Sequence, residues 1–257
     1  MGVVMNRLQL IILFVFGVSV VPGVSDAALS GNASVDHSAY AKLLSGYVHN
    51  GKVDYAGFKA DEHELDSYLE TLAQINPDNL ETNEQFAFYI NLYNSWTIKL
   101  ILTRYPDVES IKDLGSLFQS PWKKPIVKLN NQIVTLDHIE HDILRARFRD
   151  PRVHFAINCA SKSCPPLLNE PYESATLDRQ LDHVTRAFIN DSTSNYLKGK
   201  TLYVSQIFKW FAEDFHNDII GFFKKYAQDG LAKQFENSSA TLKVKYLDYD
   251  WSLNAIN

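Results

Sequence analysis

The sequence predicts an α+β fold: a single domain of mixed helices and short antiparallel strands around a buried central helix. Helical apolar periods and short alternating runs are mixed along the chain rather than strictly alternating. The segment over residues 82–105 is apolar almost all the way round, as in a helix buried on most sides. With 46% hydrophobic and 12% aromatic residues and no low-complexity linker, the chain can bury one sizeable core over residues 36–255.

Residues 1–27 are typical of a cleaved secretory signal peptide. A single basic residue, Arg7, precedes an uninterrupted apolar stretch over residues 10–18, and the small residues Ser25 and Ala27 suit a signal peptidase. The apolar stretch is shorter than the roughly 20 residues of a comfortable membrane span, which disfavours the alternative of an uncleaved anchor. We therefore expect an exported protein, periplasmic or secreted, with no stable membrane anchor after signal cleavage.

The first half of the mature chain is predicted to be largely helical. Residues 40–58 indicate a short helix that runs into an extended segment, and apolar residues at helical spacing predict a second helix over residues 61–74. The central helix is expected to begin at Thr82, because Gln85 follows three residues later in a capping-box pattern. It is expected to end before Pro106, since the residue that precedes a proline disfavours helical backbone.

The second half is predicted to mix strands and helices. A β-hairpin is expected over residues 126–136, because two alternating runs flank Asn130-Asn131, a pair that favours a tight turn. A helix should follow, since Asp137 and Glu140 have capping-box spacing. The remaining elements are expected in this order: a strand over 153–158, a helix over 176–190, a strand over 201–205, helices over 206–215 and 218–225, and an extended segment over 242–251.

Charge and ligand spacing exclude several classes of function. The chain has 25 basic and 30 acidic residues, a net charge of -5 and no basic cluster, so we predict no nucleic-acid partner. His138 and His141 could touch one metal ion, but the HExxH pattern is missing and no third ligand is identifiable. We therefore predict no metal site and no cofactor, and we expect an unidentified small molecule or peptide as the ligand.

Both cysteines lie in the stretch HFAINCASKSCPPLL, residues 154–168. Strand alternation would bury Cys159 beside Phe155, whereas Cys164 would be accessible in a polar loop before two prolines. A reactive thiol would therefore be Cys164, with His154 as the base that favours its thiolate. The cysteines could instead form a Cys159–Cys164 disulfide or both be inert. A redox couple is the least favoured alternative, because CxxxxC differs from the CxxC of thioredoxin-like motifs.

A polar stripe is predicted on the central helix. Glu84, Asn91, Asn94 and Ser95 lie within a sector of about 100°, although their neighbours are mostly aromatic and aliphatic. Their partners could be backbone groups, which would make the stripe structural. Alternatively, Asn94 orients a catalytic histidine, as in a Cys-His-Asn arrangement, while Glu84 and Asn91 bind an amide substrate.

The chain carries five blocks in the order and spacing of a known family: FAFYINLYN, HIEHDILR, DPRVHFAINCASKSCPPL, VSQIFKWFAEDF and YLDYDWSLN. In these blocks it resembles the domain of unknown function 547 family, over roughly residues 40–254. The resemblance implies a fold but no substrate, and some members look fused to glutaredoxin-like modules, which hints at thiol chemistry. His141 and Arg145 match the second block and Asn158 lies in the third, so we expect these residues to bind a ligand or support the site.

Two functions are expected from these features. The first is an exported cysteine-dependent hydrolase or transferase acting on amide or thioester bonds, with Cys164 as nucleophile, His154 as base and Asn94 as orienting residue. The second is a non-catalytic binding or scaffold module in which Cys159 and Cys164 form a disulfide. The four tryptophans and the closing DYDWSLN are expected to be core and a carboxy-terminal clasp.

Overall fold

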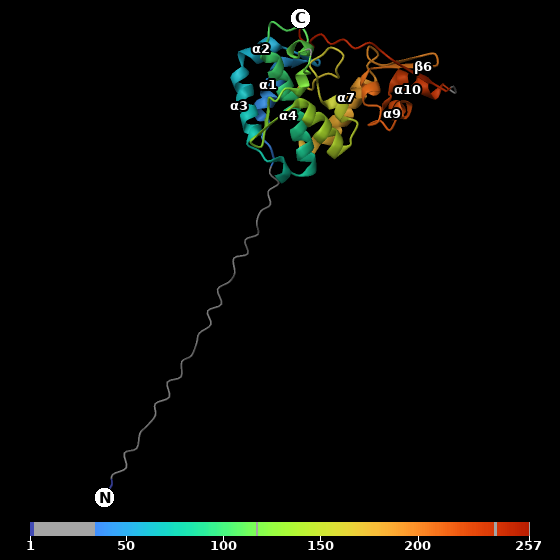
Figure 1. The fold of residues 1–257 in the computed structure, drawn as a ribbon. Helices are drawn as coiled ribbons and strands as arrows, with labels where there is room; N and C mark the ends of the chain where they lie inside the picture. The colour runs from blue at the N-terminus through green and yellow to red at the C-terminus, as the bar shows by residue number, and fades with distance from the viewer. Residues whose placement is uncertain (3–33, 117, 239–240, 257) are drawn as a thin grey trace. The chain divides into compact units, whose positions relative to one another are not determined.

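Among the described residues the longest helix is α4 (Thr82–Leu102; Figure 1). It is buried along nearly its whole length from Phe86 onward. Aromatic and aliphatic side chains surround its axis, so the helix has no side that faces solvent. This confirms the predicted central helix. The expected capping box is wrong: Glu81 precedes the helix without a side-chain cap, and Gln85 Nε2 instead donates to the carbonyl of Leu80 at 2.9 Å.

The structure, a computed structural model, describes residues 1–2, 34–116, 118–238 and 241–256. Apart from its first two residues, the expected signal peptide over residues 1–27 lies outside the described residues. The described residues from 34 onward pack into one unit. None of the helices in the described ranges is both long and apolar enough to pass through a membrane.

Short helices and a minimal hairpin precede α4. The elements in chain order are α1 (Ser38–Tyr47), β1 (Val48–His49), β2 (Lys52–Val53), α2 (Tyr55–Ala60), α3 (Glu62–Ala73) and η1 (Pro77–Asn79). α3 confirms the helix predicted over residues 61–74 and packs against both α1 and α4 through the side chains at its helical period, Leu65, Tyr68, Leu69 and Leu72. The segment after α1 that was expected to be extended contains a hairpin whose two strands have two residues each, and then α2.

The predicted hairpin over residues 126–136 is confirmed. β3 (Val127–Leu129) pairs with β4 (Gln132–Val134), and Asn130 and Asn131 both have positive φ, 45° and 60°, as a type I′ turn requires. Two 3₁₀ turns, η2 (Ile111–Leu114) and η3 (Pro121–Lys123), connect α4 to this hairpin.

The predicted helix after the hairpin is present, but most of it is a π-helix. α5 (Leu136–His138) runs directly into η4 (Ile139–Phe148), the π-helical segment. The cap is Thr135, whose hydroxyl accepts a hydrogen bond from the His138 amide at 3.0 Å, so the expected capping box between Asp137 and Glu140 is wrong. Those two acidic side chains are therefore not occupied in capping the helix. π-helical turns are rare and occur often at functional sites.

The carboxy-terminal half combines helices with a three-stranded sheet. β5 (Tyr196–Lys198) and β6 (Thr201–Val204) are antiparallel, and β7 (Lys243–Tyr246) joins β6 in parallel. The helices are η5 (Ser174–Thr176), α7 (Leu177–Ile189), α8 (Ile207–Trp210), α9 (Ile219–Tyr226) and α10 (Asp229–Glu236). The helices predicted over 176–190 and 218–225 and the strand over 201–205 are confirmed, whereas the helix expected over 206–215 is only α8. This mixture of helices and small sheets confirms the α+β class.

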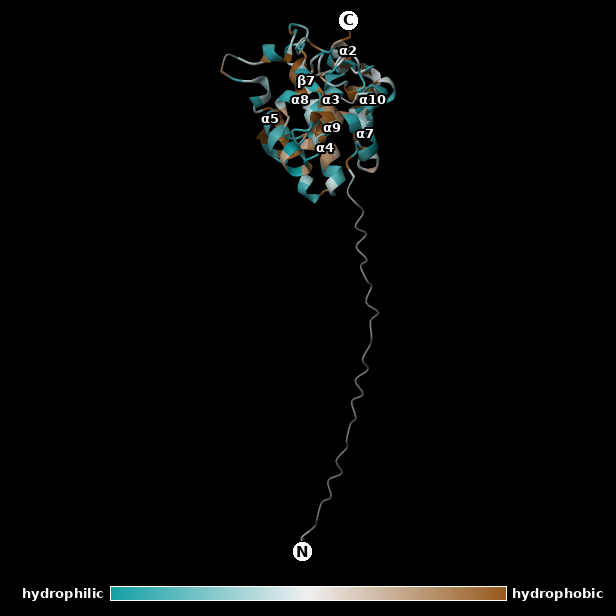
Figure 2. Ribbon diagram, turned by 90° about the vertical axis from the view of Figure 1, so that its right-hand side faces the viewer, coloured by the Kyte–Doolittle hydropathy of each residue, from teal (hydrophilic) through white to brown (hydrophobic). Residues whose placement is uncertain are grey.

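Phenylalanine rings form the core of this second half. Phe155 packs against Phe188 and Phe208 with ring centroids 5.3 and 5.8 Å apart, and Phe208 lies 4.9 Å from both Phe215 and Phe223. Each fully buried ring contributes roughly 1.5–3 kcal/mol to folding. Along the helices of the whole unit, hydrophobic residues are interspersed with hydrophilic ones (Figure 2). The cluster ties α7, α8 and α9 to the segment that carries His154.

The strand expected over residues 153–158 is wrong, because this segment begins with a short helix, α6 (Val153–Ala156). The preceding Asp150 accepts a hydrogen bond from the Arg152 amide, and Pro151 has the backbone geometry that starts a helical turn. Every residue from 153 to 158 is buried, so the alternation in the sequence does not separate a core face from a solvent face. The prediction that Cys159 points into the core and Cys164 toward solvent therefore has no basis in the structure.

Candidate functional site

A pocket of about 210 Å³ gathers segments that are far apart in the sequence. Its lining comes from α4, from α5 and η4, from the cysteine loop, from α8 and from the carboxy-terminal segment. The polar and sulfur-bearing residues of this lining are Tyr93, Asp137, Glu140, His141, His154, Cys159, Cys164 and Tyr249. Aromatic side chains make up much of the rest: Trp122, Trp210, Phe211 and Trp251.

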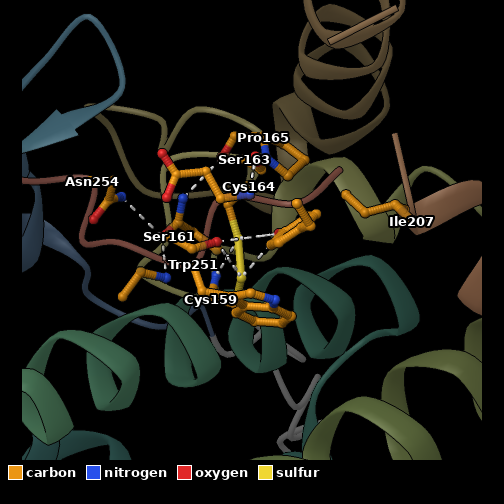
Figure 3. The surroundings of a disulfide bond; sticks show 12 residues. Cys159, Ser161, Ser163, Cys164, Pro165, Ile207, Trp251 and Asn254 are labelled. Atoms are coloured by element: carbon orange, nitrogen blue, oxygen red, sulfur yellow. Dashed lines mark hydrogen bonds between the residues drawn. A yellow bond between two sulfur atoms is a disulfide. The ribbon is translucent and has the colours of Figure 1, made fainter. Parts of the chain in front are cut away.

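Cys159 and Cys164 form a disulfide, with their Cα atoms 6.2 Å apart, and both residues line the pocket (Figure 3). The disulfide confirms the pairing that the sequence left as an alternative. Both residues are half-buried. The expectation that Cys159 is a core residue and Cys164 alone is accessible is therefore wrong, for the reason given by α6.

The loop that carries the disulfide is held by one asparagine. Asn158 Nδ2 donates to the Pro165 carbonyl at 2.8 Å, and Asn158 Oδ1 accepts from the Ala160 amide at 2.8 Å. Ala160 has φ of 60°, in the left-handed region, so the chain reverses tightly between the two cysteines. Asn158 was expected to bind a ligand, and its side chain instead closes the loop, also accepting from Asn254 at 3.2 Å.

The carboxy-terminal segment clasps the same loop, as predicted for DYDWSLN. The Lys162 amide donates to the Ser252 carbonyl at 2.8 Å, and the Asn254 amide donates to the Ala160 carbonyl at 3.2 Å. This clasp brings Tyr249 onto the sulfur atoms. The four tryptophans behave differently from expectation: one is core, whereas Trp122, Trp210 and Trp251 line the pocket.

Hydrogen-bond donors surround both sulfur atoms. The Cys159 backbone amide points at Cys164 Sγ at 2.9 Å, and the Tyr249 hydroxyl lies 3.3 Å from each sulfur. Ser161 Oγ lies 3.2 Å from Cys159 Sγ. Burial raises the pKa of Tyr249 above its ordinary value, so the phenol stays protonated and able to donate. Within the part of the chain that the structure describes, only the sulfur of Cys164 faces a backbone donor, the Cys159 amide.

His154 is held by a carboxylate at the pocket wall. Its Nε2 lies 2.7 Å from Asp214 Oδ2, and its ring stacks on Phe211 with centroids 4.0 Å apart. An ionised carboxylate only accepts hydrogen bonds, so Nε2 carries the proton in the neutral imidazole and the basic lone pair lies on Nδ1. Among the described residues, Nδ1 has no hydrogen-bond partner. His154 is 3% exposed and lines the pocket, so this free nitrogen is a candidate base.

Asp214 is kept ionised by the donors around it. Burial alone would raise the pKa of this carboxyl, but hydrogen bonds from His154 and Arg145, and the positive charge of Arg145, hold the pKa well below its usual range. Arg145 forms a two-pronged pair with it, Nε to Oδ2 at 2.6 Å and Nη2 to Oδ1 at 3.0 Å. Arg145 Nη1 also donates to His141 Nδ1 at 2.9 Å. A continuous chain of contacts thus joins His141, Arg145, Asp214 and His154.

The polar stripe on α4 is occupied by backbone partners. Asn94 Nδ2 donates to the Ala156 carbonyl at 2.9 Å, and Asn94 Oδ1 accepts from the Asn158 amide at 2.8 Å. Asn91 exchanges the same two bonds with the backbone of Tyr172, at 2.8 and 2.9 Å. Glu84 accepts from the Val35 amide at 2.7 Å, and Ser95 donates to the Asn91 carbonyl at 2.7 Å. The side chain that accepts a hydrogen bond from His154 is Asp214. Asn94 was expected in this position.

The structure brings four of the predicted site residues together: Cys164, His154 and His141 line the pocket, and Arg145 supports it from behind Asp214. It places Asn94 and Asn158 beneath the loop, and Glu84 and Asn91 at contacts with segments outside the pocket. The sequence prediction missed Asp214, Tyr249, Tyr93, Asp137 and Glu140 as pocket or supporting residues. The first two lie in the blocks VSQIFKWFAEDF and YLDYDWSLN, which were the available signal.

Comparisons with known proteins give one match. The family model described as "Protein of unknown function, DUF547" matches residues 77–189, which include α4, η4 and the cysteine loop. No curated protein and no solved structure matches the chain. The match is narrower than the expected span of residues 40–254, so Asp214 and Tyr249 lie outside it. Over residues 77–189, somewhat less than half of its length, the chain is therefore similar to the DUF547 family of proteins of unknown function.

Proposed function

We propose that the protein is a cysteine-dependent hydrolase or transferase that acts on amide or thioester bonds once its disulfide is reduced. One observation carries the proposal: a single pocket holds both cysteines and a histidine that a carboxylate orients. A nucleophile, a base and a group that orients the base are the parts that cysteine-dependent acyl transfer requires. In this arrangement Asp214 takes the orienting role that was expected of Asn94.

Reduction is the first step, because a bridged sulfur is not a nucleophile. A dithiol reductant transfers two electrons and two protons to the Cys159–Cys164 disulfide, giving two thiols and the oxidised reductant. Cys164 is the better nucleophile, because the Cys159 amide already points at its sulfur and favours the thiolate. Tyr249 donates from a second direction.

The chemical step follows from the tautomer of His154. The free Nδ1 accepts the Cys164 proton, and the thiolate attacks the carbonyl carbon of the substrate, forming a carbon–sulfur bond. The imidazolium is stabilised by Asp214 and returns the proton to the leaving amine or thiolate as the substrate bond breaks. Water, or an acceptor amine in a transferase, then attacks the acyl carbon while His154 takes its proton. The carbon–sulfur bond breaks, the acid or the new amide leaves, and the proton returns from His154 to Cys164.

A second candidate is a non-catalytic binding or scaffold module. The observation that favours it is the disulfide itself, together with the complete use of Asn91 and Asn94 by backbone groups. In this alternative the pocket binds a small molecule or peptide, and the bridge stabilises the loop. The two candidates differ in whether reduction creates activity.

The test is turnover of a model thioester and a model amide by oxidised and dithiol-reduced protein. We expect turnover after reduction alone, and its loss in Cys164→Ser and in His154→Gln. The matched control is His138→Gln, an exposed histidine that pairs with Asp142 on η4 outside the pocket. Reduced protein that turns over neither probe faster than Cys164→Ser would overturn the proposal in favour of the binding module.

We also propose that the protein is exported, periplasmic or secreted, and acts on a small-molecule or peptide ligand rather than on nucleic acid. A disulfide is compatible with an oxidising compartment, and residues 1–27 have the composition of a signal peptide. Amino-terminal sequencing of the exported fraction should begin near Ala28. An intact Met1 on soluble protein would contradict export.

A further inference from the structure

We propose that the pocket binds a primary ammonium group on a flexible aliphatic chain, such as a lysine side chain, between its aromatic wall and two carboxylates. The inference deepens the proposed function by naming the class of substrate, and it rests on that function only for what happens after binding. Its basis is the aromatic lining, the sign of the charges and the size of the space.

The aromatic wall is continuous. Trp251 lies at its centre, with ring centroids 5.6 Å from Trp210, 4.5 Å from Tyr249 and 5.8 Å from Trp122. Trp210 is 44% exposed, which is unusual for so large an apolar ring and leaves its surface open to a ligand. Tryptophan and tyrosine faces attract cations through the negative potential of their π-systems.

These rings already bind cations of the protein itself. The Lys112 ammonium lies 3.8 Å from the Trp251 ring centroid, and the Arg145 guanidinium lies 4.9 Å from that of Phe211. Neither Lys112 nor Arg145 lines the pocket. The wall therefore has the electronic character that cation binding requires, and Lys112 lies over one face of Trp251.

The charge of the pocket has one sign. Asp137 and Glu140 line it, whereas no lysine or arginine does so among the described residues. Glu140 is held in place by the Tyr93 hydroxyl, which donates to Oε2 at 2.9 Å. His141 lies beside one of these carboxylates, with its Nε2 3.8 Å from Asp137 Oδ1, and its Nδ1 accepts a hydrogen bond from Arg145 at 2.9 Å. An ammonium group entering the pocket meets two carboxylates as acceptors.

The space is that of a side chain. Pockets that hold whole drug-sized ligands measure roughly 300–1,000 Å³, and this one measures about 210 Å³. A ligand would insert one extended group and leave the remainder outside. His154, which is 97% buried and whose Nδ1 has no hydrogen-bond partner among the described residues, also lines this pocket, so the lining offers a polar group as well as apolar contact.

The test measures binding of two small probes to the oxidised protein, in which no thiol can react. Calorimetry or tryptophan fluorescence monitors the binding. The probes are Nα-acetyl-lysine methylamide and Nα-acetyl-norleucine methylamide, which share an unbranched four-carbon chain and differ in the ammonium group. We expect the lysine probe to bind at least about tenfold more tightly, as a cation–π contact plus a charge-assisted hydrogen bond implies.

Two variants locate the site. Asp137→Asn should weaken the lysine probe about tenfold and leave the norleucine probe unchanged, and Trp210→Leu should do the same while keeping an apolar surface. Asp142→Asn is the matched control, because Asp142 lies on the same helix, outside the pocket and 69% exposed. Equal binding of both probes, no binding of either, or an equal effect of Asp142→Asn would overturn the proposal. If the reduced protein turns over no thioester but the oxidised protein still binds the lysine probe, only the proposed enzymatic function is contradicted.

Discussion

Two buried polar regions of this protein, the stripe on α4 and the pocket, differ in which hydrogen-bonding atoms of their side chains are still free. On α4, Asn91 and Asn94 are saturated by backbone groups on neighbouring segments. At the pocket, the lining residue His154 pairs with the side chain of Asp214 behind it, and one nitrogen of the histidine is left without a partner among the described residues. A saturated group holds a fold together, whereas a group with remaining capacity beside a cavity can act on a ligand.

The contrast explains why burial alone is a poor guide to function. Both the stripe and the pocket place polar side chains in an apolar core, where each unpaired buried polar group costs about 1–3 kcal/mol. What separates them is the kind of partner. Substitutions in the stripe should therefore act on stability, and substitutions in the pocket on reactivity.

The largest effect should come from Asn94→Ala. This change removes the partners of the Ala156 carbonyl and the Asn158 amide at once, so we expect a loss of about 2–6 kcal/mol in the free energy of unfolding. Chemical denaturation measures it, with the exposed Asn83→Ala on the same helix as control. If Asn94→Ala does not fold, Asn94→Asp should be partly stable because it keeps the acceptor. A loss below about 0.5 kcal/mol would mean that the stripe is not structural.

The free energy of unfolding should change with pH by about 3 kcal/mol because of His37, which contacts Asn91 of the polar stripe. Its Nδ1 lies 2.7 Å from the Tyr68 hydroxyl and its Nε2 lies 3.2 Å from Asn91 Nδ2. Burial lowers its pKa to about 4 from an ordinary value of 6.5, so folding favours the neutral form. The unfolded chain then binds the proton more tightly, and stability present above pH 6.5 is lost as the pH falls toward 4, by about 3 kcal/mol.

The check is a pH series of denaturation midpoints. His37→Gln should flatten the fall between pH 6.5 and 4, whereas the exposed His49→Gln should keep it. An unchanged fall in His37→Gln would assign the acid sensitivity to other groups.

A smaller effect, on rate and pH profile, should come from Asp214→Asn. An asparagine amide would donate to His154 Nε2 and move the ring proton to Nδ1, the atom that must accept the Cys164 proton. We expect thioester turnover by the reduced protein to fall by about tenfold or more. The pH at which the rate rises as His154 loses its proton should also shift. Asp214→Glu should restore part of the rate. A loss of stability with an unchanged profile would make Asp214 structural.

Local signals predicted most of the fold. The apolar period of α3, the all-round apolar surface of α4 and the Asn130-Asn131 turn depend on neighbouring residues, so the sequence is sufficient for them. α6 was missed because alternation over six residues has no meaning when every one of them is buried. Tertiary packing, here against the phenylalanine core, overrode the period.

The candidate site was predicted only in part for a related reason. His154 and the cysteines lie within one short stretch, so the sequence could group them. Asp214 contacts His154 from 60 residues away and Tyr249 contacts Cys159 from 90 residues away. Their two sequence blocks mark them as of interest but do not show that they meet the cysteine stretch. The cysteine pairing stayed open because a five-residue separation permits a bridge without requiring one.

The central claim is that the pocket activates Cys164, and thiolate absorbance against pH tests it most directly. Cys159→Ser leaves Cys164 as the sole thiol, and Cys164→Ser leaves Cys159, so the two variants compare the sulfurs in the same pocket. We expect a pKa for Cys164 at least about one unit below the ordinary value of ~8.5, and a higher pKa for Cys159. Adding His154→Gln should raise the Cys164 value toward ~8.5. A Cys164 pKa at or above ~8.5 that does not respond to His154→Gln would contradict the claim.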